Sequence, residues 1–510
     1  MKLGPKAASA ALILSASLAL TACGGGGSAA PAGAGAPATT TLTLGAVQEI
    51  RSWDPAQAHV GHFLQPYQAA YDSLLMREPD GKLSPMLATA WKYNAANTVL
   101  TVDLRTDVTF SDGAKFDAAA AKANLDHFKT ANGPQMAQLT AVSDIKVVDA
   151  DTIELDLTTP DPSLEFYLSQ AAGLMGSPKA LGSEGIKTEP VGSGPYVMDK
   201  AATVKDSQSV FTARKDYWNK GIQKFEKVTF KILLDLTART NALVSGQVDA
   251  TLLDPKTGKQ AEGAKMTLAA NEVDWQGLTL FDRDGAKNPA LKDVRVRQAI
   301  NYAFDRKTIL DQVLVGQGTP TSQPFGKASG AWLEELENKY PYDPAKAKAL
   351  LKEAGFETGV VLELPSVPGF ETQLAVVKQQ LSDVGITVNI GAAITNTYTT
   401  DVAAQKFTSM YFSLFQGEPW VAINQIISTK ALYNPFKTTA PELQAKIDAV
   451  QNGGKDAPKL AQEVNKYVVD QAWFAPMFRV DQMYYHNSKI NVTPQIQQAV
   501  PSIYNYSPAK

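Results

Sequence analysis

The chain has 510 residues, of which 44% are hydrophobic and 19% charged, with 48 Lys and Arg against 51 Asp and Glu. This composition excludes collagen-like and wholly disordered chains, and the net charge of -3 disfavours a strongly basic nucleic-acid surface. At roughly 150 residues per domain, we expect about three domains. The single cysteine, Cys23, excludes an internal disulfide, a cysteine zinc cluster and an iron–sulfur centre.

Residues 1–22 have the pattern of a secretory signal peptide. Two lysines precede fourteen uncharged, largely apolar residues, Ala7 to Leu20, a run too short for the roughly 20 residues of a transmembrane helix. The next string, Leu20 to Gly24, resembles the bacterial lipobox, which implies that Cys23 is lipidated and anchors the mature chain to a membrane. The alternative is an unlipidated secreted protein that loses Cys23 with the signal. Residues 23–40 are predicted to be a flexible linker rich in Gly, Ala and Pro.

The first folded segment is predicted to be an α+β unit between about residues 67 and 182. Even-numbered apolar residues from Leu100 to Phe110 predict a strand with one buried face. Asp117 is expected to cap a helix that extends through Lys129. Alternating apolar residues around 145–157 then predict a pair of strands joined by a turn.

A second α/β unit is predicted further along the chain. Apolar residues from Ala299 to Val313 trace the stripe of one helix. Another helix is expected to begin with Asp343 as its N-cap and to stop at Gly355. A strand, a helix and a strand within residues 361–390 form a unit that favours a parallel sheet. Two such units on either side of a middle segment suggest two lobes with a cleft between them.

The catalytic templates find no match in the sequence. His59 and His62 are three residues apart, but a glycine separates them and no HExxH or cysteine pattern supports a metal site. Gly192–Gly194 lacks the leading glycine of a nucleophile elbow, and Ser143–Lys146 fits SxxK only at the start of a strand. We therefore predict no enzyme, no metal and no cofactor, although carboxylates brought together by folding escape such motifs.

Several short strings occur together and span nearly the whole mature chain. They are Tyr71–Leu75 with Asp80–Gly81 and Pro85–Trp91, Leu104–Arg105 with Phe110–Gly113, Val191–Tyr196, Asp216–Trp218, Ser245–Asp249, Asp293–Ile300 and Ala347–Phe356. Through this ordered set the chain resembles the bacterial extracellular solute-binding proteins of family 5, the peptide, oligopeptide and nickel-binding lipoproteins of ABC importers. The strings themselves are expected to be mostly structural: a turn at 111–113 and a tight backbone path at Val191–Tyr196.

The resemblance implies an α/β fold, a two-lobed periplasmic-binding-protein clamshell with an extra α+β subdomain in the first lobe. Mapped onto this chain, the first lobe takes residues 41–67, 189–273 and 481–510. The subdomain takes 68–188 and the second lobe 274–480. The chain would cross between the lobes near Trp275 and near Val480, and both crossings can act as hinges. Ligand contacts from both lobes favour the closed state, which then docks on the permease.

Aromatic side chains are the best candidates for the wall of the cleft, because they offer large contact area at low entropic cost. We expect ligand contacts from Trp53, from Trp275 at the first crossing, and from a second cluster within Met410–Trp420. The alternative for each aromatic residue is packing in a core. The complete set of predicted ligand-binding residues is Trp53, Trp275, Tyr411, Phe415, Glu418 and Trp420.

The second cluster departs from the pattern of the peptide binders. In those proteins an aspartate in this segment pairs with the α-ammonium group of the peptide, whereas here Leu414, Phe415 or Gln416 takes its place. Glu418 is the carboxylate nearby, and it corresponds to the later Asp-Pro of the family. A buried ammonium group without a carboxylate partner is costly. The departure therefore favours a solute that binds more through apolar or aromatic surface than a free peptide does.

The resemblance implies a monomeric, lipid-anchored binding component of an ABC importer, at the periplasm or cell surface. It would capture a peptide or other small organic solute and deliver it to permease subunits with their ATPases. Two alternatives stay open: a surface-anchored receptor or chaperone-like binding protein that is not coupled to transport, and an extracellular hydrolase. The second lacks a nucleophile–base pair in the sequence. Nucleic acid is not an expected partner.

Overall fold

The structure is a computed structural model that describes residues 40–394 and 397–510. The predicted signal peptide, Cys23 and the linker up to residue 39 lie outside the described residues. None of the helices within the described ranges is long and apolar enough to span a membrane.

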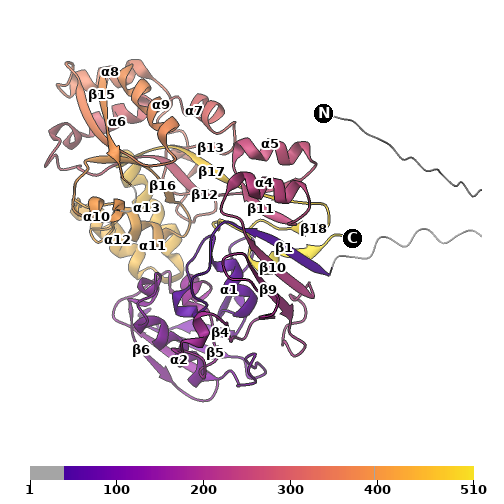
Figure 1. The fold of residues 1–510 in the computed structure, drawn as a ribbon. Helices are drawn as coiled ribbons and strands as arrows, with labels where there is room; N and C mark the ends of the chain where they lie inside the picture. Colours follow the sequence, from indigo (N-terminus) through magenta and orange to yellow (C-terminus); the bar gives the residue numbers. More distant parts are fainter. Residues whose placement is uncertain (1–39, 395–396) are drawn as a thin grey trace, which may run out of the picture. The chain divides into compact units, whose positions relative to one another are not determined.

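A nine-stranded mixed sheet dominates the fold (Figure 1). Its strand order is β16-β12-β17-β11-β1-β10-β9-β8, with β13 attached to β17. β1 pairs in parallel with β10 and β11, and the other neighbours are antiparallel. The strands are β1 (Thr41–Ala46), β8 (Tyr196–Met198), β9 (Gln208–Ala213), β10 (Lys227–Ile232), β11 (Ala250–Leu253), β12 (Thr267–Leu280), β13 (Thr319–Pro320), β16 (Ser409–Phe415) and β17 (Phe474–His486).

β12 and β17 are long strands that pair with each other from Thr267–His486 to Thr279–Phe474. At one end β17 pairs with β11, and at the other β12 pairs with β16. The predicted crossings fall in the middle of this pair, where Trp275 faces Arg479. The register shifts twice, between Glu272 and Asp274 and between Gln276 and Gly277. A Cβ on Gly277 would lie 2.3 Å from the carbonyl oxygen of Ala475, so the second irregularity requires glycine.

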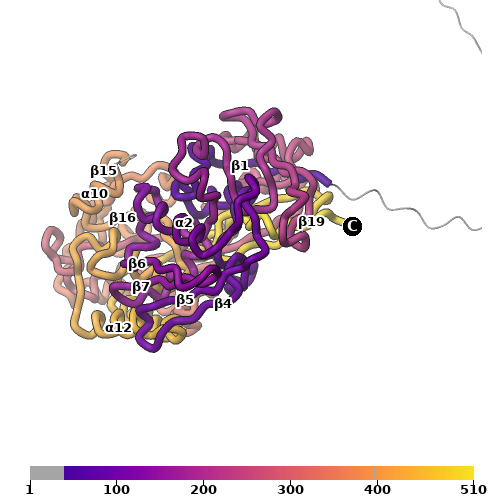
Figure 2. Tube along the Cα trace, turned by 90° about the horizontal axis from the view of Figure 1, so that it is seen from below, coloured from indigo at the N-terminus to yellow at the C-terminus, as the bar shows by residue number. Residues whose placement is uncertain are grey.

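The predicted α+β unit contains a four-stranded antiparallel sheet in the order β4-β5-β7-β6 (Figure 2). The predicted helix is confirmed as α2 (Ala118–Thr130), with the Asp117 carboxylate accepting the Ala120 amide at 2.8 Å. The predicted strand is shorter than its apolar pattern, because it ends at Leu104 while Val108 and Phe110 are buried outside it. The strands are β4 (Ala88–Tyr93), β5 (Val99–Leu104), β6 (Val142–Val147) and β7 (Thr152–Leu157).

The predicted strand-helix-strand unit is confirmed as β14 (Val360–Ser366), α9 (Glu371–Ser382) and β15 (Ile386–Ala393), with β14 and β15 parallel. The helix capped by Asp343 is α8 (Pro344–Glu353). The single helix predicted over Ala299–Val313 is wrong. It is divided into α6 (Val294–Tyr302) and α7 (Arg306–Val313), because the Asp305 carboxylate accepts the Thr308 amide and caps a new helix.

The remaining helices and strands connect these units. They are α1 (Leu64–Ala70), α3 (Leu164–Leu168), α4 (Leu236–Val244), α5 (Pro255–Gly263), α10 (Tyr398–Ala403), α11 (Pro419–Ala422), α12 (Pro441–Asn452), α13 (Ala457–Asp470), β2 (Leu75–Arg77), β3 (Leu83–Pro85), β18 (Ile490–Val492) and β19 (Tyr506–Pro508). One hydrophobic core joins β1 to the α+β unit that contains α2 and the four-stranded sheet, called the α2 unit below, through residues such as Leu44 and Leu125. Separate cores lie around α6, α8 and β14 and around α11–α13.

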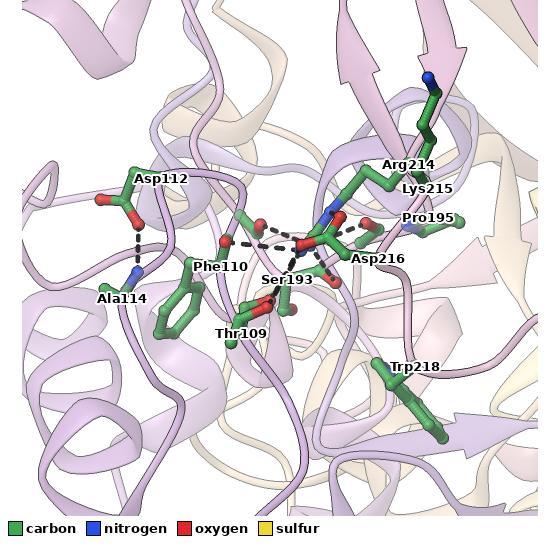
Figure 3. Close-up of polar contacts among 12 residues, drawn as sticks. Thr109, Phe110, Asp112, Ala114, Ser193, Pro195, Arg214, Lys215, Asp216 and Trp218 are labelled. Atoms are coloured by element: carbon green, nitrogen blue, oxygen red, sulfur yellow. Dashed lines mark hydrogen bonds and ion pairs between the residues drawn. The ribbon is translucent and has the colours of Figure 1, made fainter.

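Two of the short sequence strings are held together by the buried side chain of Arg214 (Figure 3). Its Nη1 donates to the carbonyl oxygens of residues 192–194 at 3.1–3.4 Å. Its Nη2 donates to the carbonyl oxygens of Thr109 and Phe110 and to the Asp216 carboxylate. A Cβ on Gly194 would lie 2.4 Å from the carbonyl carbon of Ala70, so this backbone path needs glycine. The structural role expected for these strings is confirmed.

Asp72 ties two further strings together. Its side chain is fully buried and accepts hydrogen bonds from Tyr217 Oη at 2.8 Å and Trp218 Nε1 at 2.9 Å. Burial raises the pKa of Asp72 to about 7, although both donors favour the ionised form. The folded protein therefore holds a proton on Asp72 at pH values where the unfolded chain has lost it.

We expect this buried carboxyl group to make stability depend on pH. Between its ordinary pKa of 3.8 and about 7 the folded state binds more protons, so the free energy of unfolding falls as pH rises through that window. Asp72→Asn removes this titration and should reduce the fall in the free energy of unfolding by about 4 kcal/mol. Urea unfolding of both proteins at several pH values from 4 to 7.5 measures the difference. Parallel pH profiles would contradict the assignment.

Candidate ligand site at the strand crossing

A cavity of about 300 Å³ lies beside the paired strands β12 and β17, at the place where both strands pass from one predicted lobe to the other. β12 contributes residues 270–272 and β17 contributes Asp481. The other walls come from residues 326–328, from Gln416 just after β16, and from Gln497 near the C-terminus. Residues assigned by sequence to the first lobe and to the second therefore line the same space.

The cavity is rich in charged and polar groups. Glu272 and Asp481 face each other directly in the β12–β17 register, and both are half-buried. Burial, and then the nearby Glu272 carboxylate, raises the pKa of Asp481. Gln416 is 2% exposed, and its Oε1 is buried without a hydrogen-bond partner in the described part of the chain.

A second contact between the predicted lobes forms beside this cavity. The Glu418 carboxylate accepts the Val421 amide at 2.8 Å, which caps α11, and also accepts a hydrogen bond from Ser163 Oγ. Burial raises the pKa of Glu418, while these donors and the charge of Arg77 oppose the rise. Arg77 Nη2 donates to Gln497 Oε1 at 2.5 Å. The α2 unit, the C-terminal segment and α11 thus meet around one set of polar groups.

Two of the predicted ligand-binding residues lie at or next to this region. Phe415 is half-buried and pairs with Asp274 across β16 and β12. Burial raises the pKa of Asp274 to about 6, against the hydrogen bond that Ser413 Oγ donates to it at 3.3 Å. Glu418 is committed to the α11 cap and to Ser163. Their roles in ligand binding stay predictions.

The other predicted residues are placed in cores or in a different cavity. Trp275 is fully buried against Phe474, with ring centroids 5.6 Å apart. Tyr411 is fully buried and its hydroxyl donates to Gln276 Oε1 at 3.3 Å. Trp420 is 7% exposed and packs in the core around α11–α13.

Trp53 lies against a separate cavity of about 480 Å³. That cavity is lined by segments within residues 46–66 and 187–232, all of which belong to the predicted first lobe or its subdomain. The Trp53 ring packs on Tyr67 and Phe211 at centroid distances of 5.5 and 5.4 Å. The structure therefore does not bring Trp53 to the residues that line the crossing.

Comparison with known proteins decides the family. Residues 82–430, more than half of the chain, match the family described as "Bacterial extracellular solute-binding proteins, family 5 Middle". The chain belongs to family 5 of the bacterial extracellular solute-binding proteins. The resemblance carried by the short strings is thereby confirmed.

Curated relatives and solved structures resemble this chain over much of its length. The glutathione-binding protein GsiB of Salmonella paratyphi A (strain ATCC 9150 / SARB42) is 30% identical over 342 residues, which cover 63% of this chain and 63% of GsiB. The chain thus matches less than two thirds of that relative's length. HbpA2 from Haemophilus parasuis has 20% identity and a TM-score of 0.81, covering 92% of this chain and 100% of its own.

A third relative, an ABC transporter substrate-binding protein from Sinorhizobium meliloti, is 26% identical with a TM-score of 0.75. It covers 92% of this chain and 100% of its own length. These structural likenesses, together with the large mixed sheet and its flanking helices, confirm the predicted α/β fold of the two-lobed periplasmic binding proteins.

Sequence reasoning missed three residues that the structure brings to the cavity: Glu272, Asp481 and Gln416. One signal was available, because the predicted crossings near Trp275 and Val480 lie within a few residues of both carboxylates. Within residues 40–394 and 397–510 no group of three or more His, Cys, Asp or Glu is placed to hold a metal ion.

Proposed function

We propose that the chain is the substrate-binding component of an ABC importer, which captures a small organic solute or peptide between its lobes and delivers it to permease subunits with their ATPases. The observation that carries this proposal is the cavity at the crossing, which takes its walls from both predicted lobes. A solute there touches both lobes only when they are closed. Such differential contact is what shifts an open–closed equilibrium.

The names of the relatives support the class of solute. GsiB is named a glutathione-binding protein, and glutathione is a small peptide. One similar solved structure is the periplasmic binding protein DppA from Helicobacter pylori in complex with the peptide STSA. We therefore propose a peptide-sized organic solute, with Phe415 and Glu418 at the second-lobe wall.

We also propose that Cys23 is lipidated, so that the folded chain is a monomer held at the membrane surface in the periplasm or on the cell exterior. The lipobox-like string Leu20 to Gly24 and the Gly/Ala/Pro-rich stretch after it support this anchor. A linker of this composition behaves as a flexible tether and lets the tethered protein reach a permease.

The binding role is tested by native mass spectrometry of the freshly purified protein, followed by uptake assays with the compound found. We expect a bound small molecule, and cells without the gene should lose its uptake. Glu418→Ala removes the link to Ser163 and the α11 cap, so retained ligand should fall by about tenfold, as for a lost buried partner of 1–3 kcal/mol. Glu335→Ala, at an exposed glutamate of the same predicted lobe, is the control. Unchanged uptake in the deletion strain would contradict the proposal.

A further inference from the structure

The two carboxylates of the crossing cavity form an unfavourable arrangement as they stand. Directly opposed residues of an antiparallel pair have Cβ atoms only about 4.5–5.5 Å apart, and like charges in such positions destabilise the sheet. Glu272 and Asp481 occupy such a pair. Within residues 40–394 and 397–510 neither side-chain carboxylate is hydrogen-bonded or ion-paired. Two half-buried carboxyl groups thus share one space, and neither has an ion-pair partner within the described residues.

Gln416 adds a third oxygen acceptor to the same cavity. Its Oε1 is buried and has no donor in the described part of the chain, and a buried acceptor without a donor is unfavourable. The backbone of Gln416 is fixed in place, because its main-chain carbonyl oxygen accepts a hydrogen bond from the Gly326 amide at 2.9 Å. A Cβ on Gly326 would lie 2.7 Å from Gln416 Cδ, so glycine at 326 leaves room for this side chain.

The positive groups nearby do not satisfy these acceptors. Lys327 is the cation that lines the cavity, and it is exposed. Two carboxylates against one ammonium group leave a charge of -1 on the cavity wall. Arg77 donates a hydrogen bond to Gln497 Oε1, and its guanidinium group lies over the ring of Phe166. A space of about 300 Å³ is too large for a bare ion and matches an organic group of a few heavy atoms.

We propose that the crossing cavity is a subsite for a cationic organic group of the solute, an ammonium or a guanidinium, held by Glu272, Asp481 and Gln416 Oε1. The inference rests on the proposed binding function and specifies its solute. The positive group would replace repulsion between the carboxylates by two charge-assisted hydrogen bonds and would supply the missing donor to Gln416. It would also place the positive end of the solute on the strands that join the lobes.

Matched fragments test the subsite without knowledge of the whole solute. Saturation-transfer NMR of the full mature protein compares propylguanidinium with propylurea, which has nearly the same shape and no charge. We expect the guanidinium signal to exceed the urea signal by at least about fivefold, since paired, buried charges dominate such recognition. In the Glu272→Gln/Asp481→Asn protein the two fragments should give equal, low signals.

Controls separate loss of the subsite from loss of the fold. Glu335→Gln should keep the wild-type preference, and Glu272→Gln alone serves if the double variant does not fold. Equal signals from both fragments on the wild type, or an undiminished guanidinium preference in a folded variant, would overturn the subsite. Failure of the uptake assay with an intact guanidinium preference would instead refute the transport role alone. A co-purified solute without a positive group would refute the subsite alone.

Discussion

Replacement of Arg214 by methionine should lower the free energy of unfolding by about 3–5 kcal/mol. The guanidinium group is buried and donates to carbonyl oxygens of two separate segments, 109–110 and 192–194. Methionine fills much of the space but leaves those oxygens without donors, and each buried unsatisfied group costs about 1–3 kcal/mol. Urea unfolding followed by circular dichroism measures the loss.

The neighbouring Lys215→Met is the matched control, because Lys215 is exposed and the substitution is chemically similar. We expect a change within about 0.5 kcal/mol there. If Arg214→Met and Lys215→Met were equally stable, the guanidinium network would not hold the two segments together. Arg214→Lys should recover only part of the loss, because one ammonium group cannot reach both sets of carbonyl oxygens at once.

Cys23→Ala should move the protein out of the membrane fraction or leave it as the unprocessed precursor. The physical reason is that the chain would lose the acyl chains that we propose as its membrane anchor, and each buried methylene contributes about 0.8 kcal/mol to membrane binding. Fractionation of cells that express either form, with immunoblotting and intact-mass measurement, reports both location and processing.

Ser28→Ala, in the same predicted linker, should leave the wild-type distribution unchanged. A Cys23→Ala protein that is still cleaved after residue 22 and still bound to membranes would show that lipidation is not the anchor. Soluble wild-type protein of the mass expected for cleavage after the cysteine would instead favour the secreted, unlipidated form.

Local features of the fold could be predicted from the sequence because their causes are local. The Asp117 cap and apolar spacing identify α2, and Asp343, Pro344 and Gly355 bracket α8. The division at Asp305 escaped the same reasoning, because the apolar stripe continues across it while the capping hydrogen bond interrupts the helix. Periodicity reports which side of the chain is buried and does not report where a helix restarts.

The candidate site was less predictable because distant segments build it. Glu272 and Asp481 meet only through the β12–β17 register, and no local pattern in the sequence specifies that pairing. Aromatic residues were ambiguous for a different reason. Trp275 and Tyr411 lie on strands of the central sheet and are fully buried, and residue type alone does not separate an aromatic residue of a ligand wall from one of a packed core.

The β12–β17 pair runs through both predicted lobes as a hydrogen-bonded ladder with two irregularities. Such a pair resists stretching and shear along its length, whereas it bends and twists where its ladder is irregular. The first irregularity lies between Glu272 and Asp274, beside the cavity wall. We therefore expect any rotation of the two predicted lobes against each other to bend the pair at this irregularity, next to the residues that we propose bind the solute. We therefore expect binding of a solute in the cavity and bending of the β12–β17 pair to be coupled.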